Sequence, residues 1–340
     1  MPNPDMDRVK FNRATKRYFE ESPLEDFAVY DGSLGSEPAE NYSFYAALGG
    51  IDVLVIKAGT SIVAHEGFQR TAYNMSCIAE DISKLKKERG LYVILVSSGA
   101  IGLGRKERLR KGEKISHKDS ASPQQRQLDA IEGQPFLSRL WHGVFKYSNG
   151  VQTSDYLVTH ADILEENRHK LLGRYARSFM SGEIPIVNED DAKSLEEIDI
   201  LMNGVRVFGD NDELASLHAQ MFAAAGYKTA LILLSNTDGI YTADSIRDET
   251  FIPIRVVRDS TGLEAQVAEI SSSRGRGGIV SKIQAAKDAV ACDVPVIIAN
   301  GQYCNHDAPY QRKRAGAERR YNVLEAILDG NVVGTRFVVP

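Results

Sequence analysis

Two lysines carry the clearest chemical signal in this sequence. Lys57 ends a short apolar run, residues 51–56, and is followed by a turn of small residues that contains Gly59. A lysine in this position is unusual, because lysine side chains normally extend their ammonium group into water. Lys282 follows a glycine-rich stretch, residues 275–278, where glycines allow a backbone to approach phosphates closely. We interpret both lysines as fixed positive charges for a phosphoryl group in transfer.

Two acidic, amide-containing segments complete the set. Gly209-Asp210-Asn211-Asp212 precedes an expected helix, and Asn188-Glu189-Asp190-Asp191 follows a short apolar run. Helix capping is the alternative for the first segment, since Asp and Asn are common N-caps. Three polar, non-interchangeable side chains in a row exceed that need, and an aspartate between two lysines would hold both in register. An ordinary acidic loop is the alternative for the second segment, where carboxylates would suit an α-ammonium group.

A third feature is the turn Ser97-Ser98-Gly99, which joins the apolar run 93–96 to an expected helix. Small residues at the start of a helix leave backbone N–H groups open to anions. Open α/β sheets bind their ligands at such strand-to-helix junctions. The residues around the turn therefore belong to the same expected site.

Alternating strands and helices must position these residues. We expect a charged connection over 105–121 and a hairpin at Asn203-Gly204. Strands alternating with helices predict an open α/β sandwich with a mainly parallel sheet. Residues 50–340 would form this domain, and the aromatic-rich residues 1–49 would be an arm, helical near 11–19, that packs on it or on another subunit. Expected strands are 51–57, 92–96, 152–158, 184–187, 229–234, 294–299 and 332–339, and expected helices follow Gly99 and cover 71–89, 123–146, 163–180, 212–225, 265–270 and 279–292.

Composition excludes several classes of function. The formal net charge of −5 argues against a general nucleic-acid-binding protein. The three cysteines have no CxxC spacing and the seven histidines are scattered, so we expect no protein-held metal site. No apolar run approaches the roughly 20 residues of a membrane span, and the N-terminus has no apolar signal core. We expect a soluble cytoplasmic protein.

Six segments occur in the order seen in glutamate 5-kinases, and the chain resembles the amino acid kinase superfamily over residues 51–340. It is similar both to the free-standing bacterial enzymes and to the kinase half of pyrroline-5-carboxylate synthase. The resemblance implies a three-layer αβα sandwich, the amino acid kinase fold. The segments are Lys57-Ala58-Gly59-Thr60-Ser61, Val96-Ser97-Ser98-Gly99-Ala100, Pro185 to Ala192, Gly209-Asp210-Asn211-Asp212, Gly239 to Asp244 and Gly277 to Lys282.

The resemblance also implies a role for each matching residue. Lys57 and Lys282 would stabilise the transferring phosphoryl group, and Asp212 would orient them. Glutamate would be held by Ser98, Asp191 and Asn211, with Asn188 and Asp210 in support. The nucleotide would be bound by Ser235, Asn236, Gly275, Arg276, Gly277 and Gly278, while Gly59 and Gly99 would approach its phosphates.

The implied reaction is the ATP-dependent phosphorylation of the side-chain carboxylate of L-glutamate, the first step of proline biosynthesis. The resemblance also implies ATP and Mg²⁺ as cofactors, proline as a possible feedback inhibitor, and a homo-oligomer. Many bacterial members carry a C-terminal PUA domain, whereas we expect none in this chain. Asp190 stands where the family usually has Asn, Ser235-Asn236 where many members have Thr-Asp or Ser-Asp, and Ile279 where Met is common.

Two alternatives remain open. Asp190 and the hairpin over 198–208 leave room for a sister kinase that acts on another carboxylate, a carbamate or a phosphate. A non-catalytic small-molecule sensor of the same fold is the other alternative. Presence of Lys57, Asp212 and Lys282 together disfavours a sensor, which does not need phosphoryl-transfer charges.

Overall fold

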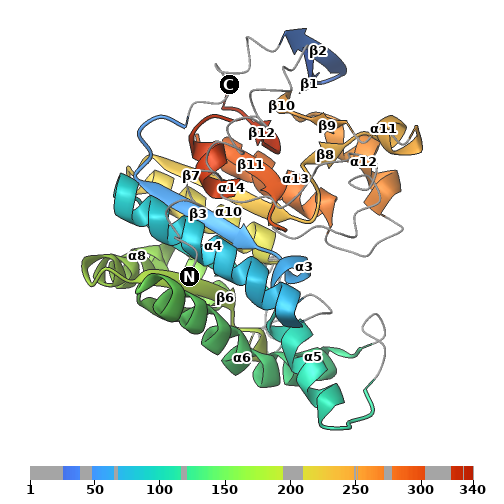
Figure 1. Ribbon diagram of the computed structural model, residues 1–340. Coiled ribbons are helices and arrows are strands. Elements are labelled where there is room, and N and C mark those ends of the chain that lie inside the picture. Colours follow the sequence, from blue (N-terminus) through green and yellow to red (C-terminus); the bar gives the residue numbers. More distant parts are fainter. Residues whose placement is uncertain are drawn as a thin grey trace, which may run out of the picture.

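The computed structural model describes residues 26–38, 48–64, 68–115, 121–193, 210–248, 250, 252–271, 278–302, 323–331 and 333–339. Ten strands form one sheet with helices on both faces (Figure 1). The sheet order is β2 (Leu34–Pro38), β1 (Asp26–Asp31), β10 (Val256–Asp259), β12 (Thr335–Phe337), β11 (Val296–Asn300), β7 (Thr229–Ser235), β3 (Val53–Ala58), β4 (Tyr92–Ser97), β6 (Ile184–Glu189) and β5 (Thr153–Val158). A separate small sheet pairs β8 (Ile240–Tyr241) with β9 (Pro253–Ile254).

The parallel part of the sheet runs from β11 to β5. Neighbouring strands pair in parallel from β11 through β7, β3, β4 and β6 to β5. Their carboxyl ends therefore meet at one edge, where ligands bind in open α/β sheets. The expected α/β sandwich with a mainly parallel central sheet is confirmed.

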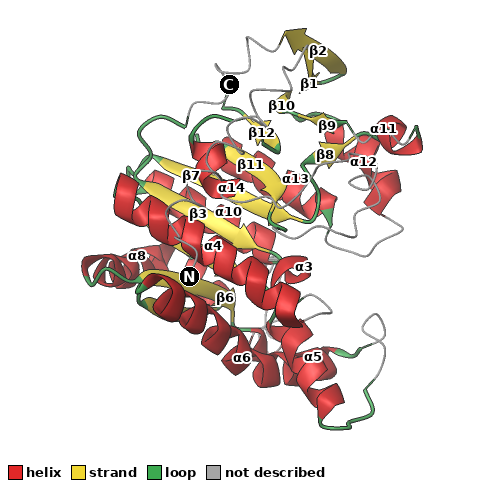
Figure 2. Cartoon of the chain, in the orientation of Figure 1, coloured by secondary structure: helices red, strands yellow, loops and turns green. Residues whose placement is uncertain are grey.

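Two helical layers cover the sheet, because successive strand residues point to opposite faces. Val53 and Val55 belong to one buried cluster, whereas Leu54 and Ile56 belong to the other. The first cluster packs on α8 (Glu165–Met180), α10 (Asn211–Ala224), α12 (Leu263–Ser271) and α13 (Ile279–Val290). The second packs on α3 (Thr60–Val63), α4 (Phe68–Arg89), α6 (Pro123–Asn149) and α14 (Val323–Leu328). Figure 2 shows these helices on either side of the strands.

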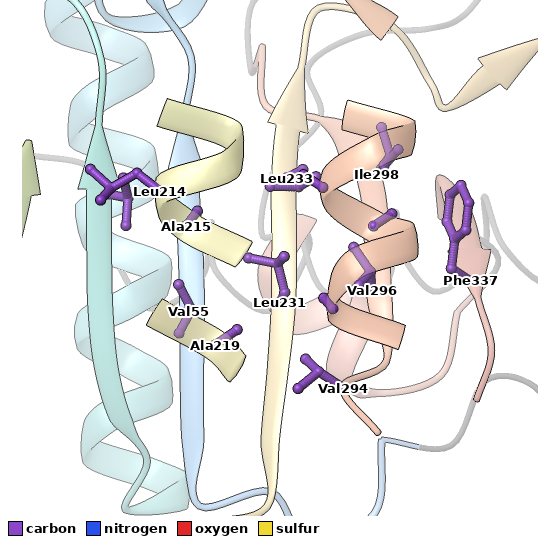
Figure 3. Packing of buried hydrophobic residues seen from close by; sticks show 14 of the residues in the cluster. Val55, Leu214, Ala215, Ala219, Leu231, Leu233, Val294, Val296, Ile298 and Phe337 are labelled. Carbon is purple, nitrogen blue, oxygen red and sulfur yellow. The ribbon is translucent and has the colours of Figure 1, made fainter. Parts of the chain in front are cut away.

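The first cluster connects α10 to the centre of the sheet. Figure 3 shows Leu214 and Ala215 of α10 beside Val55 of β3 and Leu231 of β7. All four side chains are fully buried. Burial of a leucine or valine side chain contributes about 1.5–3 kcal/mol, so this contact fixes the start of α10 relative to the strand that carries Lys57.

At the other end of the sheet the strand direction reverses. β12 lies between β10 and β11, antiparallel to β11 and parallel to β10. β1 pairs in parallel with β10, and β2 folds back on β1. Residues 26–38 of the expected arm therefore form a hairpin that continues the main sheet, while residues 11–19 lie outside the described part.

Three expectations about elements need correction. The expected connection over 105–121 is helical at its start, because α5 (Ala100–Arg110) continues to Arg110. The expected helix over 163–180 is divided into α7 (His160–Ile163) and α8, since Leu164 has a ψ of 142°. The last strand covers 335–337 rather than 332–339. The hairpin expected over 198–208 falls outside the described residues, and α11 (Ala243–Arg247) was not expected.

In the described part of the chain, no helix has the length and apolar character needed to cross a membrane.

Candidate active site

The two predicted lysines meet at one carboxylate. Lys57 lies near the carboxyl end of β3, Asp212 in the first turn of α10, and Lys282 in the first turn of α13. The Lys57 Nζ atom is 2.6 Å from Asp212 Oδ1, and the Lys282 Nζ atom is 2.8 Å from Asp212 Oδ2. The Ser281 hydroxyl also donates to Asp212 Oδ2, at 3.1 Å. We call Lys57, Asp212 and Lys282 the charge triad.

The charge triad is buried and carries a surplus positive charge. All three residues are at most 7% exposed. Burial lowers the pKa of Lys57, with the attraction of Asp212 acting in the opposite direction and the nearby Lys282 adding to the decrease. Burial opposes ionisation of Asp212, yet the two ammonium groups outweigh it and hold its pKa below the usual range. Two cations around one anion leave a net charge of about +1 that an incoming anion can neutralise.

The start of α10 is capped by Asp210. Its carboxylate accepts hydrogen bonds from the backbone N–H groups of Asp212, at 2.9 Å, and Glu213, at 3.1 Å. The alternative of helix capping therefore holds for Asp210, which fixes the backbone of the residue that holds both lysines. The side chains of Asn211 and Asp212 take no part in this capping and make other contacts.

Polar side chains from three strand and helix ends form a second group, which we call the amide network. Asn211 Nδ2 donates to Ser98 Oγ at 3.1 Å and to Asn188 Oδ1 at 3.0 Å. Asn188 Nδ2 donates in turn to Gln134 Oε1 of α6, at 2.9 Å. Ser98 follows β4, and Asn188 lies in β6, one residue before its end. The structure thus brings together three of the predicted substrate residues, next to the charge triad through Asn211.

The turn after β4 requires a glycine. Gly99 has a φ of 116°, in the left-handed region, and a methyl group there would lie 2.5 Å from Val63 Cγ2. The backbone N–H of Ser98 donates to Ala58 O at 3.0 Å, which ties this turn to the end of β3. Gly59 differs, because its φ is −78° and a methyl group would lie no closer than 3.6 Å to Lys57 Nζ.

Two neighbouring acids follow β6. Burial, and then the nearby charge of Asp190, raise the pKa of Asp191 to about 6. Asp190 is 6% exposed and pairs with Lys193 at 3.0 Å. A carboxylate that titrates near pH 6 is poorly stabilised as an anion, so an ammonium ligand would improve its surroundings considerably.

Of the residues predicted to bind the nucleotide, the structure describes Ser235, Asn236 and Gly278. Ser235 ends β7, the strand next to β3, and Asn236 follows it with an exposed side chain. Gly278 is the N-cap of α13, four residues before Lys282. Gly275, Arg276 and Gly277 lie outside the described residues.

Sequence reasoning missed several residues at the same edge. Gln134 is one, and Trp141 is another, since its Nε1 donates to Ser97 Oγ at 2.7 Å. Asn300 ends β11, is fully buried and donates from Nδ2 to Asp238 Oδ1 at 3.2 Å. The end of a parallel strand was the available signal for Asn300, whereas Gln134 and Trp141 lie within a long helix and carry no positional signal.

Known proteins resemble this chain over most of its length. The model of the amino acid kinase family matches residues 52–300. A glutamate 5-kinase of a Synechococcus strain is 33% identical over 288 residues, covering 84% of this chain and 67% of the relative. That of Bacteroides thetaiotaomicron is 34% identical, covering 74% and 64%, and that of Clostridium perfringens is 32% identical, covering 84% and 94%. The chain thus spans about two thirds of the first two relatives and nearly all of the third. It belongs to the amino acid kinase family.

Proposed function

We propose that this protein is a glutamate 5-kinase, which transfers the γ-phosphoryl group of ATP to the side-chain carboxylate of L-glutamate. The charge triad carries the proposal, because two buried ammonium groups on one carboxylate suit a phosphoryl group that passes between two anionic oxygens. The similarity to three glutamate 5-kinases supports glutamate as the acceptor.

The acceptor supplies its own nucleophile. A glutamate side chain has a pKa of about 4.3 and is ionised at neutral pH, so no general base is needed. The contribution of the protein is then alignment and charge neutralisation. Lys57 and Lys282 would contact the oxygens of the transferring group, and Asp212 would keep the two ammonium groups apart and oriented.

The amide network and Asp191 would hold the amino acid. Ser98, Asn211 and Asn188 offer hydroxyl and amide groups, and Asp191 offers a carboxylate for the α-ammonium group. Ser235, Asn236 and the glycine-rich loop 275–278 would bind ATP, which would arrive as its Mg²⁺ complex with the metal held by phosphates and water. Asp210 would contribute indirectly, by fixing the start of α10.

The product would be γ-glutamyl phosphate, an acyl phosphate that enters proline biosynthesis. We place the reaction in the cytoplasm, with proline as a candidate inhibitor and a homo-oligomer as the working assembly.

The decisive experiment is ATP turnover with glutamate in the presence of hydroxylamine, which traps an acyl phosphate as the hydroxamate. We expect ADP release that depends on glutamate, together with an equal amount of hydroxamate. A panel of other carboxylates, carbamates and phosphates separates the alternatives. Turnover with another acceptor alone would identify a sister kinase, and ATP binding without turnover of any acceptor would favour a sensor.

A further inference from the structure

Helix α6 contacts the candidate site along one line of side chains. Gln127, Gln134 and Trp141 are spaced by seven residues, which in an α-helix returns the side chain to nearly the same face. Each meets a different segment at the sheet edge. Gln127 Nε2 donates to Ala192 O after β6, Gln134 accepts from Asn188, and Trp141 donates to Ser97.

We propose that Gln134 is a positioning residue for the acceptor amino acid, because it sets the orientation of the amide groups of Asn188 and Asn211. The inference rests on the proposed glutamate kinase function and deepens it. Gln134 would act through Asn188, which is 3% exposed and donates a hydrogen bond to it.

In the amide network, the direction of one hydrogen bond determines the direction of the next. Gln134 Oε1 accepts, so Asn188 must turn its Nδ2 toward α6 and its Oδ1 toward Asn211. Asn188 Oδ1 then accepts from Asn211 Nδ2, which also donates to Ser98 Oγ. Each amide has one end that donates and one that accepts, so a choice at Gln134 fixes the choice at the next two residues.

The consequence is an open acceptor at the site. The Nδ2 atom of Asn211 donates both hydrogen bonds that this side chain makes within the network. Its Oδ1 atom is buried and has no hydrogen-bond partner among the described residues. Buried polar atoms are normally satisfied, and an oxygen beside Ser98 is suited to an ammonium or N–H donor of the bound amino acid. Rotating the amide would place the NH₂ group there and repel such a donor.

The test compares variants of Gln134 in the full chain by steady-state kinetics with the hydroxamate readout. Gln134→Met keeps the length of the side chain and removes the acceptor, whereas Gln134→Glu keeps an acceptor facing Asn188. We expect the KM for glutamate to rise about tenfold or more in Gln134→Met and to stay within about threefold of wild type in Gln134→Glu. The KM for ATP should stay within about twofold in both. Gln124→Met, at an exposed position of the same helix, is the matched control and should behave as wild type.

A structural role alone would shift thermal stability without separating the two KM values. An unchanged KM for glutamate in Gln134→Met, or equal losses in the Met and Glu variants, would overturn the inference. If Gln134→Met does not fold, Gln134→Glu decides, since a near-normal KM supports the proposal and a large increase contradicts it. Wild-type protein without glutamate-dependent hydroxamate would remove the proposed function itself, which is a different result from an active wild type with unaffected variants.

Discussion

Single residues set the charge of the candidate site. In the charge triad, Asp212 binds both ammonium groups through different oxygens, so neither lysine is neutralised alone. Removing either lysine would take the net charge from about +1 to zero while leaving Asp212 paired. The loss should therefore appear when charge moves during the reaction rather than as unfolding.

We predict that Lys57→Ala and Lys282→Ala each lower kcat by about 100-fold or more, with smaller changes in the KM for glutamate. Steady-state kinetics with the hydroxamate readout measures both parameters. Lys84→Ala is the matched control, because Lys84 also pairs with a carboxylate, that of Glu325, between α4 and α14. A near-normal kcat in both triad variants would contradict the role of the triad.

A second residue-scale prediction concerns pH. Asp191 has a pKa raised to about 6, and only its ionised form attracts an ammonium group. We expect kcat/KM for glutamate to be constant above pH 6 to 7 and to fall toward tenfold per pH unit below that range, since kcat/KM reports the free enzyme. The profile should be measured between pH 5 and 8, above the titration of the substrate carboxylate.

Asp190→Asn removes one of the two causes of the raised pKa, so the fall should move to lower pH. The control is Asp244→Asn, which also removes the acid of an i,i+3 pair, with Arg247, at an exposed place. An unchanged inflection in Asp190→Asn, or a flat wild-type profile, would show that Asp191 does not govern binding of the amino acid.

Sequence reasoning found Lys57 and Asp212 because their types conflict with their surroundings, and Lys282 because it follows a glycine-rich stretch. A lysine after a buried strand and an aspartate beyond a needed cap both require an explanation. Gln134 presents no such conflict, since a glutamine within a helix is ordinary. Its importance depends on which helix face meets the sheet edge, and this follows from packing between distant segments.

At the scale of elements, two glycines allow the backbones of α5 and α6 to approach each other closely. A methyl group on Gly133 would lie 1.8 Å from Ala100 O, and one on Gly104 would lie 1.7 Å from Asp129 O. Arg108 adds an ion pair with the buried Asp129, at 2.8 Å. Since Ala100 is the first residue of α5, this contact fixes the helix that begins at the Gly99 turn.

We predict that Gly133→Ala destabilises the protein by about 1–3 kcal/mol or more, because the backbones of the two helices must separate. Gly143→Ala is the matched control on the same helix, where nothing lies within 4 Å of the added methyl group. There we expect a gain of about 0.5–1 kcal/mol, from the better helix propensity of alanine. Urea unfolding measures both, and equal effects of the two substitutions would contradict the close packing.

The length of α5 was not predictable from the same sequence. Its second half is rich in Arg and Lys, which resembles a solvated connection. In the structure Arg108 contacts Asp129 and Glu113, and Lys106 donates to Ala64 O at 2.9 Å. Two of these partners, Asp129 and Ala64, are more than 20 residues away in sequence, and a local pattern does not contain them.

For the whole molecule, the hairpin of β1 and β2 extends the sheet beyond the parallel strands. Tyr30 of β1 is 1% exposed and its hydroxyl donates to Thr261 O, at 2.8 Å, ahead of α12. Arg258 of β10 pairs with Glu37 of β2. The aromatic content of residues 1–49 indicated that they pack, but strand formation at 26–38 depends on pairing with β10, which is more than 200 residues away.

We predict that Tyr30→Phe lowers the free energy of unfolding by about 1 kcal/mol, the usual contribution of one hydrogen bond. Denaturant unfolding followed by circular dichroism gives the value. Tyr147→Phe removes a hydroxyl from a residue that is 85% exposed and should change nothing measurable. Equal stability of the Tyr30 variant and wild type would show that this hydrogen bond adds little to the folded molecule.

The place of β12 has a consequence for how the protein is made. In the described sheet, β12 is the strand between β10 and β11, yet residues 335–337 are translated after every other strand. Until they leave the ribosome, a nascent chain carries two open strand edges that face each other with one strand missing. During that interval the two edges could pair wrongly, unless a chaperone protects them.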